Sequence, residues 1–517
     1  MNSFSGSLFV THKMRRVQSM IHPRYLNYYG KSNMYLGLDY GTSEIKALLM
    51  GDNGDIIATH GLPLSIQRPQ PQWSEQSADE WWRVTNDLVL QLRDKVGNFK
   101  WAQIRGIGLS GQMHGAVLLN ENNDVLRPVI LWNDTRSSAE CAELEQAVPD
   151  LHAITGNLAM AGFTAPKLLW VRKHEPDIFA QTKTVLLPKD YIRFLLTGKK
   201  VSEMSDAAGM LWLDVAKRDW SDEVLAACGM DRSFMADLVE GSHVSGSLKA
   251  DLAEKWGLSP DVIVAGGGGD NAASAVGVGA VNPNDAFISL GTSGVVFVVN
   301  ENYRPAPQSA VHCFCHALPN RWHQMSVMLS AAACLSWYCK LVGVKEVELL
   351  AEIERLSDEQ RAQAPIFLPY LSGERTPHND AFATGSLHGL THAHGRAEIG
   401  YAVLEGVSFG LADGVRVLQE SGTQISECSL LGGGARSPYW AQLLADILQI
   451  QIVTHKGGET GGALGAARLA ALACGGDETQ ICTKPEINQI FNPNKKDFLP
   501  TRYAQFRKLY SVEKSNR

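Results

Sequence analysis

The first regular pattern of apolar positions along the chain begins at residue 35. The stretches 35–40 and 44–50 are rich in apolar residues, and only Gly41-Thr42-Ser43 separates them. Two apolar runs joined by a short turn predict a β-hairpin rather than the strand followed by a helix of a P-loop. A third strand is predicted at 55–60, and the helical periodicity of 77–95 predicts a helix with Ser77 at its N-cap.

A buried strand is predicted where the apolar pattern resumes, at 104–109. It leads into the loop Ser110-Gly111-Gln112-Met113-His114-Gly115, which is followed by a short strand at 117–119. Met113 and His114 therefore stand in a glycine-bracketed loop after a buried strand. A lone Met or His usually fills a core, but this position favours a site that faces a cleft.

A third apolar strand, at 262–265, ends in four consecutive glycines and Asp270. The small residues of 272–279 then predict a closely packed helix. Bare backbone before an acidic residue lets the carboxylate sit on the floor of a cleft. Asp270 is therefore either a general base, as transfer to an alcohol requires, or the N-cap of the helix.

The opening pattern returns in the second half of the chain. Residues 286–297 again read as strand, Gly291-Thr292-Ser293 turn and strand, and a strand at 428–431 is followed by Gly432-Gly433-Gly434. The offset between the two hairpins is 288 − 36 = 252 residues. An internal echo of this kind predicts two similarly folded halves.

The domain organisation follows from this echo and from the turn residues at 282–284. We expect an N-terminal extension without regular structure at 1–33, an N-terminal domain at 34–281 and a C-terminal domain at 282–511. The extension contains five basic and no acidic residues, so an organellar transit peptide is the alternative to a plain extension.

Composition narrows the class of protein. The 517 residues carry a formal net charge of −7, so no general field attracts nucleic acid or an anionic membrane. No window approaches the ~20 apolar residues that a membrane helix needs. The nine cysteines are expected to be buried, reduced thiols, as in a cytoplasmic protein.

The two Gly-Thr-Ser turns are suited to binding phosphate. Glycine lets the backbone approach an anion, and successive N–H groups and hydroxyls supply donors. One such turn is weak evidence because turns are rich in these residues, but two, together with a glycine-rich turn that opens a helix, form an uncommon combination.

This combination resembles the actin-like ATPase (ribonuclease H-like) fold, an α/β fold of two lobes with duplicated mixed sheets and a catalytic cleft between them. The resemblance implies that ATP binds across the lobes. It assigns Asp39 to Mg²⁺, although Asp39 could instead cap its own turn, and leaves Lys46 either at phosphate or in solvent. The implied nucleotide-binding residues are Gly41, Thr42, Ser43, Gly291, Thr292, Ser293, Gly433 and Gly434.

The chain also resembles the FGGY family of carbohydrate kinases from Met34 to Tyr510. Residues 162–170 and 385–407 are similar to the two family signatures, and 112–115 and 370–379 resemble the members that phosphorylate D-xylulose. The resemblance implies that Asp270 is the base for the C5 hydroxyl. It further implies that the sugar contacts Met113, His114, Asp270 and Asn271, and that the protein is a cytoplasmic homodimer.

Three alternatives remain open on the sequence. A related kinase would act on ribulose, an erythritol-like polyol or gluconate. A chaperone or sugar sensor on the same fold would need a peptide-binding or DNA-binding domain, for which the extension at 1–33 is too small. A catalytically dead scaffold is opposed by the intact Asp39, Asp270 and both Gly-Thr-Ser turns.

Overall fold

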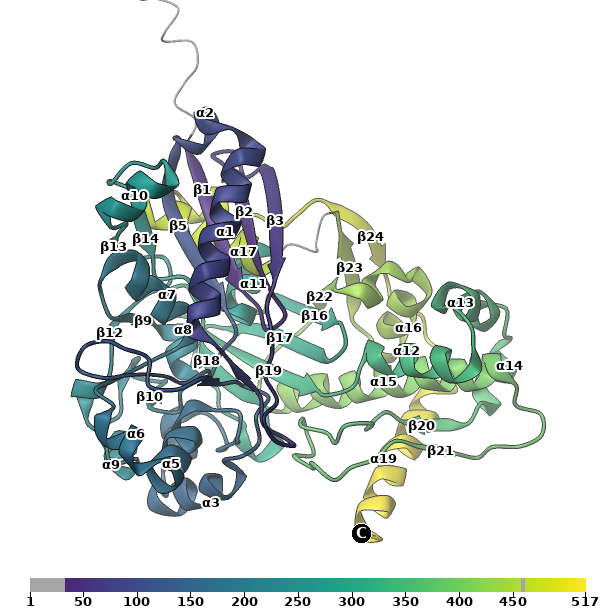
Figure 1. The fold of residues 1–517 in the computed structure, drawn as a ribbon. Coiled ribbons are helices and arrows are strands. Elements are labelled where there is room, and N and C mark those ends of the chain that lie inside the picture. Colours follow the sequence, from purple (N-terminus) through teal and green to yellow (C-terminus); the bar gives the residue numbers. More distant parts are fainter. Residues whose placement is uncertain (1–32, 457–460) are drawn as a thin grey trace, which may run out of the picture.

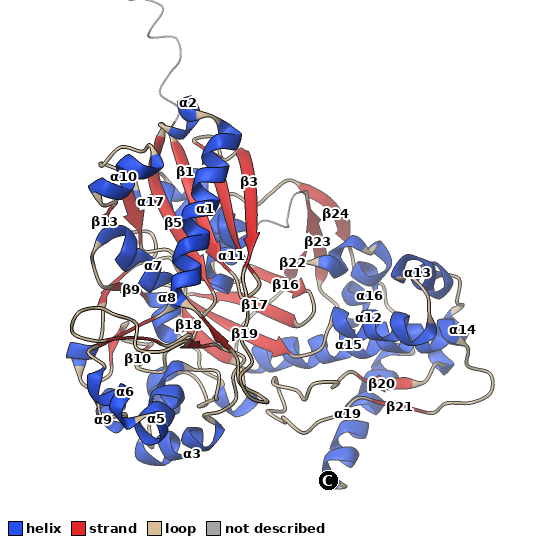
Figure 2. Ribbon diagram, viewed as in Figure 1, coloured by secondary structure: helices blue, strands red, loops and turns tan. Residues whose placement is uncertain are grey.

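The computed structural model describes residues 33–456 and 461–517 (Figure 1). The predicted extension at 1–33 lies outside the described residues except for Asn33. Figure 2 shows two groups of strands, each flanked by helices.

The first sheet has seven strands, and its main path runs in the order β13-β14-β5-β1-β2-β3. The neighbours β1 and β5 are parallel, as are β5 and β14, while β2 is antiparallel to both β1 and β3. The short β15 pairs with the end of β5. The strands are β1 (Met34–Tyr40), β2 (Glu44–Gly51), β3 (Ile56–Pro63), β5 (Ile104–Gly111), β13 (Val244–Ser247), β14 (Ile263–Ala265) and β15 (Gly268–Gly269).

The second sheet also has seven strands, in the order β18-β19-β17-β16-β22-β23-β24. Here β16 is antiparallel to β17 and parallel to β22, and β22 is parallel to β23. The strands are β16 (Ala286–Leu290), β17 (Gly294–Asn300), β18 (His312–Cys315), β19 (Trp322–Met328), β22 (Glu427–Leu431), β23 (Gln451–His455) and β24 (Ile487–Phe491).

The two sheets share one topology. The path β3-β2-β1-β5-β14-β13 has the same sequence of antiparallel and parallel pairings as β19-β17-β16-β22-β23-β24. The two hairpins that the sequence predicts therefore belong to a larger repeated unit of six strands. The predicted two-lobed α/β fold with duplicated mixed sheets is confirmed.

The predicted first helix is present as α1 (Ala78–Val96). The Ser77 side chain accepts a hydrogen bond from the backbone N–H of Glu80, as predicted for an N-cap. The buried face of α1 carries Trp81, Leu88 and Leu92 and packs with the first sheet. Burial of such a face provides most of the stability of a surface helix.

One helix crosses over from the second half of the sequence. The alanine-rich α17 (Gly461–Ala473) packs against β1, β5 and α11 (Asp270–Gly277) of the first half (Figure 1). Glycines make this approach possible: a Cβ at Gly37 would lie 1.9 Å from the Ala463 carbonyl oxygen, and one at Gly108 would lie 1.8 Å from that of Ala466.

A hydrophobic cluster joins the two halves. It includes Phe163, Leu168 and Trp212 from the first half together with Phe297 and Phe314 from the second half. Hydrogen bonds cross beside it, from Asn157 Nδ2 to the Cys313 carbonyl (3.0 Å) and from Trp322 Nε1 to the Val215 carbonyl (2.8 Å). We call this set of residues the shared cluster.

Most helices of the first half lie in the long segment between β5 and β13. Helices of the second half flank the second sheet (Figure 2). The longer ones are α3 (Ser138–Ala147), α5 (Thr164–His174), α7 (Pro188–Thr197), α10 (Ala250–Trp256), α12 (Ala332–Val342), α13 (Glu346–Glu354), α15 (Arg396–Glu420), α16 (Pro438–Leu448) and α19 (Leu499–Ser515). Within the described residues, none of the helices combines the length and hydropathy needed to cross a membrane.

The cysteines are all free thiols, as expected. Seven are buried, but Cys141 is only half-buried and Cys474 is exposed. The prediction of burial was therefore wrong for these two residues.

Candidate active site

The first Gly-Thr-Ser turn, Gly41–Ser43, joins β1 to β2 as predicted. The Thr42 hydroxyl donates to Gln112 Oε1 (3.1 Å) and accepts from Trp132 Nε1 (3.0 Å). Gln76 Nε2 donates to the Thr42 carbonyl (2.7 Å). The turn is thus held in place from three sides, while Ser43 remains exposed.

The second loop, Gly291–Ser293, lies at the start of α12. The carbonyls of Gly291 and Thr292 accept hydrogen bonds from the N–H groups of Ala332 and Ala331 (2.8 and 2.9 Å). Thr292 and Ser293 are exposed, and no hydrogen bond engages their hydroxyls within residues 33–456 and 461–517. The loop therefore presents donors on a backbone whose carbonyls are already satisfied.

In the third glycine-rich turn, the two glycines that are predicted to contact the nucleoside have different surroundings. Gly433 is exposed, with open space where a Cβ would stand. Gly434 is buried, and a Cβ there would lie 2.4 Å from the Leu290 side chain, so this glycine also lets the turn pack on β16. Ser437 caps α16 directly afterwards.

Asp39 stands near the end of β1, opposite Ser110 of the parallel strand β5. Ser110 Oγ donates to Asp39 Oδ1 (2.7 Å), and no N–H of the following turn binds the carboxylate within the described chain. Asp39 therefore does not cap its own turn. Burial raises the pKa of Asp39, while the Ser110 hydrogen bond and the charge of Lys46 lower it.

A cavity of about 450 Å³ opens beside Asp39, lined also by Lys46, Gly461 and Gly462. Lys46 pairs there with Glu44 Oε1 (2.9 Å), so its ammonium group lines the same cavity as the Asp39 carboxylate. A Cβ at Gly462 would lie 2.6 Å from Asp39 Oδ2. Glycine at this position keeps the second carboxylate oxygen clear.

This environment fits Mg²⁺ better than a metal that needs many protein ligands. The described residues contain no cluster of three or more His, Cys, Asp or Glu side chains that could hold a metal. Mg²⁺ usually keeps several waters and takes only one or two carboxylates together with substrate phosphates. Asp39, with Oδ2 open, provides that kind of site.

Asp270 is the first residue of α11, and Gly269 is the N-cap. The interpretation of Asp270 as the N-cap is therefore wrong. Its Oδ1 accepts hydrogen bonds from the Asn271 backbone N–H (2.7 Å) and from Asn271 Nδ2 (3.0 Å), and not from the N–H groups further along α11. Burial and the nearby charge of Asp39 raise the pKa of Asp270 to about 6. A half-buried carboxylate of this pKa is still ionised at neutral pH and has a stronger affinity for a proton than an ordinary Asp.

The glycine run before Asp270 is packed on every side. A Cβ at Gly266 would lie 2.3 Å from the Glu240 carbonyl oxygen, and Gly267 adopts φ +78° against Leu109. Gly268 and Gly269 pair with β5. The run therefore holds Asp270 in place rather than loosening it.

Buried side chains of α7 and α8 (Met204–Ala208) support this run from behind. Arg193 donates to the Gly266 carbonyl and also binds Asp190, while Ser205 Oγ accepts from the Gly269 N–H (3.0 Å). Lys189 Nζ lies 2.8 Å from Asp190 and 2.9 Å from Asp206. The sequence indicated none of these charged residues as parts of the site.

Met113 lies beside the glycine run, and His114 follows it in the loop after β5. Met113 is buried, and a Cβ at Gly269 would lie 3.0 Å from its Cγ. His114 adopts φ +71°, and its Nδ1 lies 2.6 Å from the Gly209 carbonyl oxygen. Because a carbonyl only accepts, His114 carries its proton on Nδ1 and leaves Nε2 as an acceptor.

The imidazole of His114 is neutral. Burial lowers the pKa of His114 to about 3, against the opposing effect of the Gly209 hydrogen bond. Lys167, the lysine of the first signature stretch, donates to the His114 carbonyl (2.7 Å), and Thr164 does the same (3.1 Å). These contacts give the signature a role in holding the loop.

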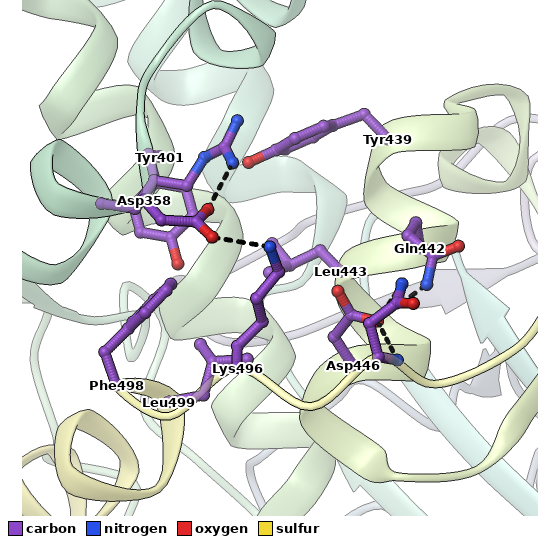
Figure 3. A pocket seen from close by; sticks show the side chains of 11 residues that line it. Asp358, Tyr401, Tyr439, Gln442, Leu443, Asp446, Lys496, Phe498 and Leu499 are labelled. Atoms are coloured by element: carbon purple, nitrogen blue, oxygen red, sulfur yellow. Dashed lines mark hydrogen bonds and ion pairs between the residues drawn. The ribbon is translucent and has the colours of Figure 1, made fainter.

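A second cavity of about 170 Å³ lies apart from these residues (Figure 3). Its side chains come from α14 (Asp358–Gln363), α15, α16 and the segment before α19, and Asp358 lies 2.7 Å from Lys496 and 3.0 Å from Arg361. None of the predicted site residues lines this cavity.

Comparison with known proteins identifies the family. Residues 34–277 match the N-terminal domain of the FGGY family of carbohydrate kinases, and residues 286–474 match its C-terminal domain. The xylulose kinase of Escherichia coli strain K12 is 51% identical over 486 residues, covering 92% of this chain and 98% of that protein.

Solved structures agree with this match. The crystal structure of a xyloylose kinase from Brucella ovis is 48% identical with a TM-score of 0.91, covering 94% of this chain and 100% of that one. A gluconate kinase from Lactobacillus acidophilus is 25% identical with a TM-score of 0.85, covering 94% and 98%. The chain therefore belongs to the FGGY family of carbohydrate kinases, phosphotransferases with an alcohol acceptor.

Proposed function

We propose that the protein transfers the γ-phosphoryl group of ATP to the C5 hydroxyl of D-xylulose, which yields D-xylulose 5-phosphate and ADP. The observation that carries this proposal is that Asp270, whose pKa is raised by burial and by nearby Asp39, directly follows Gly269, which packs against Met113. The 51% identity to a protein named xylulose kinase supports D-xylulose as the acceptor.

Asp270 is the general base in this proposal. Its Oδ1 is occupied by Asn271, so Oδ2 is the oxygen that accepts the proton of the attacking hydroxyl. The pKa of about 6 keeps the carboxylate ionised at neutral pH and brings its proton affinity closer to the optimum for a base. Asn271 fixes the orientation of the carboxylate and is the neighbour that contacts the sugar.

His114 positions the acceptor. A neutral imidazole with Nδ1–H directed at the Gly209 carbonyl presents Nε2 to a sugar hydroxyl as a hydrogen-bond acceptor. Met113 provides an apolar wall against Gly269. An acceptor oriented by His114 and deprotonated by Asp270 reacts as part of a single bound complex, which lowers the entropic barrier.

The nucleotide is proposed to lie between the two Gly-Thr-Ser turns. The Thr42 and Ser43 turn of the first half and the Thr292 and Ser293 turn of the second half offer N–H and hydroxyl donors to the phosphates. Gly433 and Gly434 are assigned to the nucleoside. Mg²⁺ would be held by Asp39 and would neutralise charge on the transferring phosphates.

The protein is further proposed to be a cytoplasmic homodimer. Nine free cysteines support a reducing compartment, since disulfides persist mainly in oxidising ones. The dimer rests on the family resemblance. A domain boundary at 282–284 remains our proposal for the chain.

A coupled ADP-release assay over a panel of acceptors tests the proposed function. D-Xylulose, ribulose, erythritol and gluconate would be compared by kcat/KM at saturating Mg·ATP, with a sugar-free reaction as the control. We expect D-xylulose to be preferred. A more than ~10-fold preference for another acceptor would overturn the choice of sugar, and ATP consumption that no sugar changes would overturn the kinase proposal.

A further inference from the structure

Arg375 reaches the sugar side of the site from the second half of the chain. It lies between β20 (Ile366–Leu368) and β21 (Ser386–His388), within the stretch Glu374-Arg375-Thr376-Pro377. Both neighbours bond to β19 of the second sheet or to residues that flank β18 and β19. Glu374 Oε1 accepts from the N–H groups of Arg375 (2.7 Å) and Leu329 (3.0 Å), and Thr376 Oγ1 donates to the Ala310 carbonyl (2.9 Å). The backbone therefore projects the Arg375 side chain in one direction.

The Arg375 guanidinium lacks an ion-pair partner. Its Nη1 donates to His312 Nε2 (3.2 Å), and within residues 33–456 and 461–517 no carboxylate oxygen lies within 4.0 Å of it. The Glu374 carboxylate attracts the charge, but its hydrogen bonds go to backbone N–H groups. The other N–H groups of this half-buried guanidinium have no partner among the described residues and are not fully buried, so they are open to the acceptor oxygens of a ligand.

A row of rings connects Arg375 with His114. The His312 ring stacks on Phe314, with centroids 5.4 Å apart, and meets Phe163 edge-on at 5.6 Å. Phe163 in turn meets His114 edge-on at 4.6 Å. His114 and Phe163 come from the first half of the chain, whereas His312, Phe314 and Arg375 come from the second.

The contacts of Arg375 place it on the His114 side of the site. Arg375 bonds to His312, which is two ring contacts from His114. Within the described residues, no hydrogen bond or ion pair joins Arg375 to Asp270, whose Oδ1 accepts from Asn271. The charge of Arg375 also lowers the pKa of both His114 and His312.

We infer that Arg375 is a sugar-binding residue contributed by the second half of the protein, and that its N–H groups donate to the oxygens at the C1–C2 end of the ketose. The inference rests on the proposed function and identifies a specificity residue for it. A ketone oxygen can only accept hydrogen bonds, and a guanidinium can only donate them, so the two match. The neutral Nε2 of His114 supplies the acceptor that a neighbouring hydroxyl needs.

The position of Arg375 also makes sugar binding a joint property of both halves. Its backbone is fixed to the second sheet and His114 is fixed to the first half, so a sugar bound by both residues bridges them.

Steady-state kinetics of Arg375→Met and Arg375→Lys with D-xylulose and with xylitol test this inference. Xylitol has a hydroxyl in place of the C2 ketone. Arg361→Met, on the cavity of Figure 3, is the matched control. We expect Arg375→Met to raise the KM for D-xylulose at least ~10-fold, with little change in nucleotide affinity, and to reduce the preference for D-xylulose over xylitol. Arg375→Lys, which keeps the charge but loses the planar fork, should be intermediate.

The outcomes separate this inference from the proposed function. A wild-type enzyme that ignores D-xylulose would overturn the proposed function itself. An active wild type whose KM for D-xylulose survives Arg375→Met within ~2-fold, or whose loss is equal for ketose and polyol, would overturn the role of Arg375 alone. Thermal melts accompany each variant, and Arg375→Lys provides the same comparison if Arg375→Met fails to fold.

Discussion

Gly462, at the start of α17, lies so close to Asp39 that a Cβ on the glycine would stand 2.6 Å from Asp39 Oδ2. The two residues come from opposite ends of the chain. The free carboxylate oxygen of Asp39, which we assign to Mg²⁺, is therefore kept open by a residue without a side chain.

Gly462→Ala is expected to disturb Asp39 without changing the fold. The added methyl must displace the carboxylate or the start of α17, so the Mg²⁺ concentration for half-maximal rate should rise and kcat should fall at least ~10-fold. Initial rates over a Mg²⁺ series measure both effects. In the control Gly461→Ala, the added Cβ would lie 3.1 Å from the Ser274 hydroxyl and should be tolerated. An unchanged Mg²⁺ dependence in Gly462→Ala would contradict the assignment of Asp39.

Asp270→Ala and Asp270→Asn are expected to lower kcat by at least ~10² while nucleotide binding stays nearly intact, because the base is lost but the phosphate loops are not. Single-turnover rates and nucleotide titrations measure the two properties separately. Retained turnover in both variants would rule out Asp270 as the base.

Asp270→Asn should also change how the stability of the protein depends on pH. The pKa of Asp270 is raised to about 6, so between about pH 4 and pH 6 the native state holds more protons than the unfolded chain and stability falls as pH rises. Above pH 6 the native state bears the full cost of the buried charge. Asp270→Asn removes that charge, and its Tm at pH 7.5 should exceed that of the wild type, with a smaller difference at pH 5.

The pH profile should show one acid limb set by Asp270. The value of kcat/KM is expected to fall below about pH 6, because a protonated carboxyl cannot accept the hydroxyl proton. His114, with a pKa near 3, stays neutral over this range and adds no second limb. A limb governed by a group that titrates near pH 7 or above would contradict the model of a neutral His114 beside an ionised Asp270.

His114→Asn isolates the role of the imidazole. Asn tolerates the positive φ of this position, so the backbone should be retained while the Nε2 acceptor is lost. We expect the KM for D-xylulose to rise ~10-fold or more and the KM for ATP to change little. The exposed His392→Asn serves as the control. Equal changes in both KM values would indicate a general structural defect instead.

Arg193→Met tests the support behind the glycine run. Arg193 is fully buried and binds Asp190, the Gly266 carbonyl and the Val201 carbonyl. Its loss should lower the free energy of unfolding by about 3 kcal/mol or more. Replacing the half-exposed Arg232, which pairs with Asp219 and Asp222, by Met should lower the free energy of unfolding by only about 1 kcal/mol. Chemical denaturation of both variants measures these two changes. Equal losses of unfolding free energy would refute a special role for the buried Arg193–Asp190 pair.

The parts of the site that the sequence predicted are local in the chain. The hairpins at Gly41–Ser43 and Gly291–Ser293 are each specified by apolar runs on either side of a short turn, and the structure contains both. Ser77 caps its helix because a single side chain and the next turn determine that contact. Patterns of this range can be seen in one sequence.

The parts that the sequence did not predict depend on distant packing. The sequence near Gly462 does not indicate that α17 crosses to the first sheet, because small residues such as Gly461, Gly462 and Ala463 are compatible with close packing but do not identify the partner. The ion pairs of Lys189 and Arg193 behind Asp270 are formed by residues far from it in the chain. Asp270 itself was considered as an N-cap because Asp suits that position, and only the backbone shows that Gly269 occupies it.

The shared cluster affects how the protein unfolds. Phe163 and Phe314 belong to the same apolar interior, and α17, from the second half of the chain, packs against the first sheet. A cut near residue 282 would strip both fragments of part of their interior and expose it to water. The repeated topology points to an ancestral duplication. Because the two copies share this interior, we expect them to unfold together, so heating the intact chain should produce one calorimetric transition instead of two.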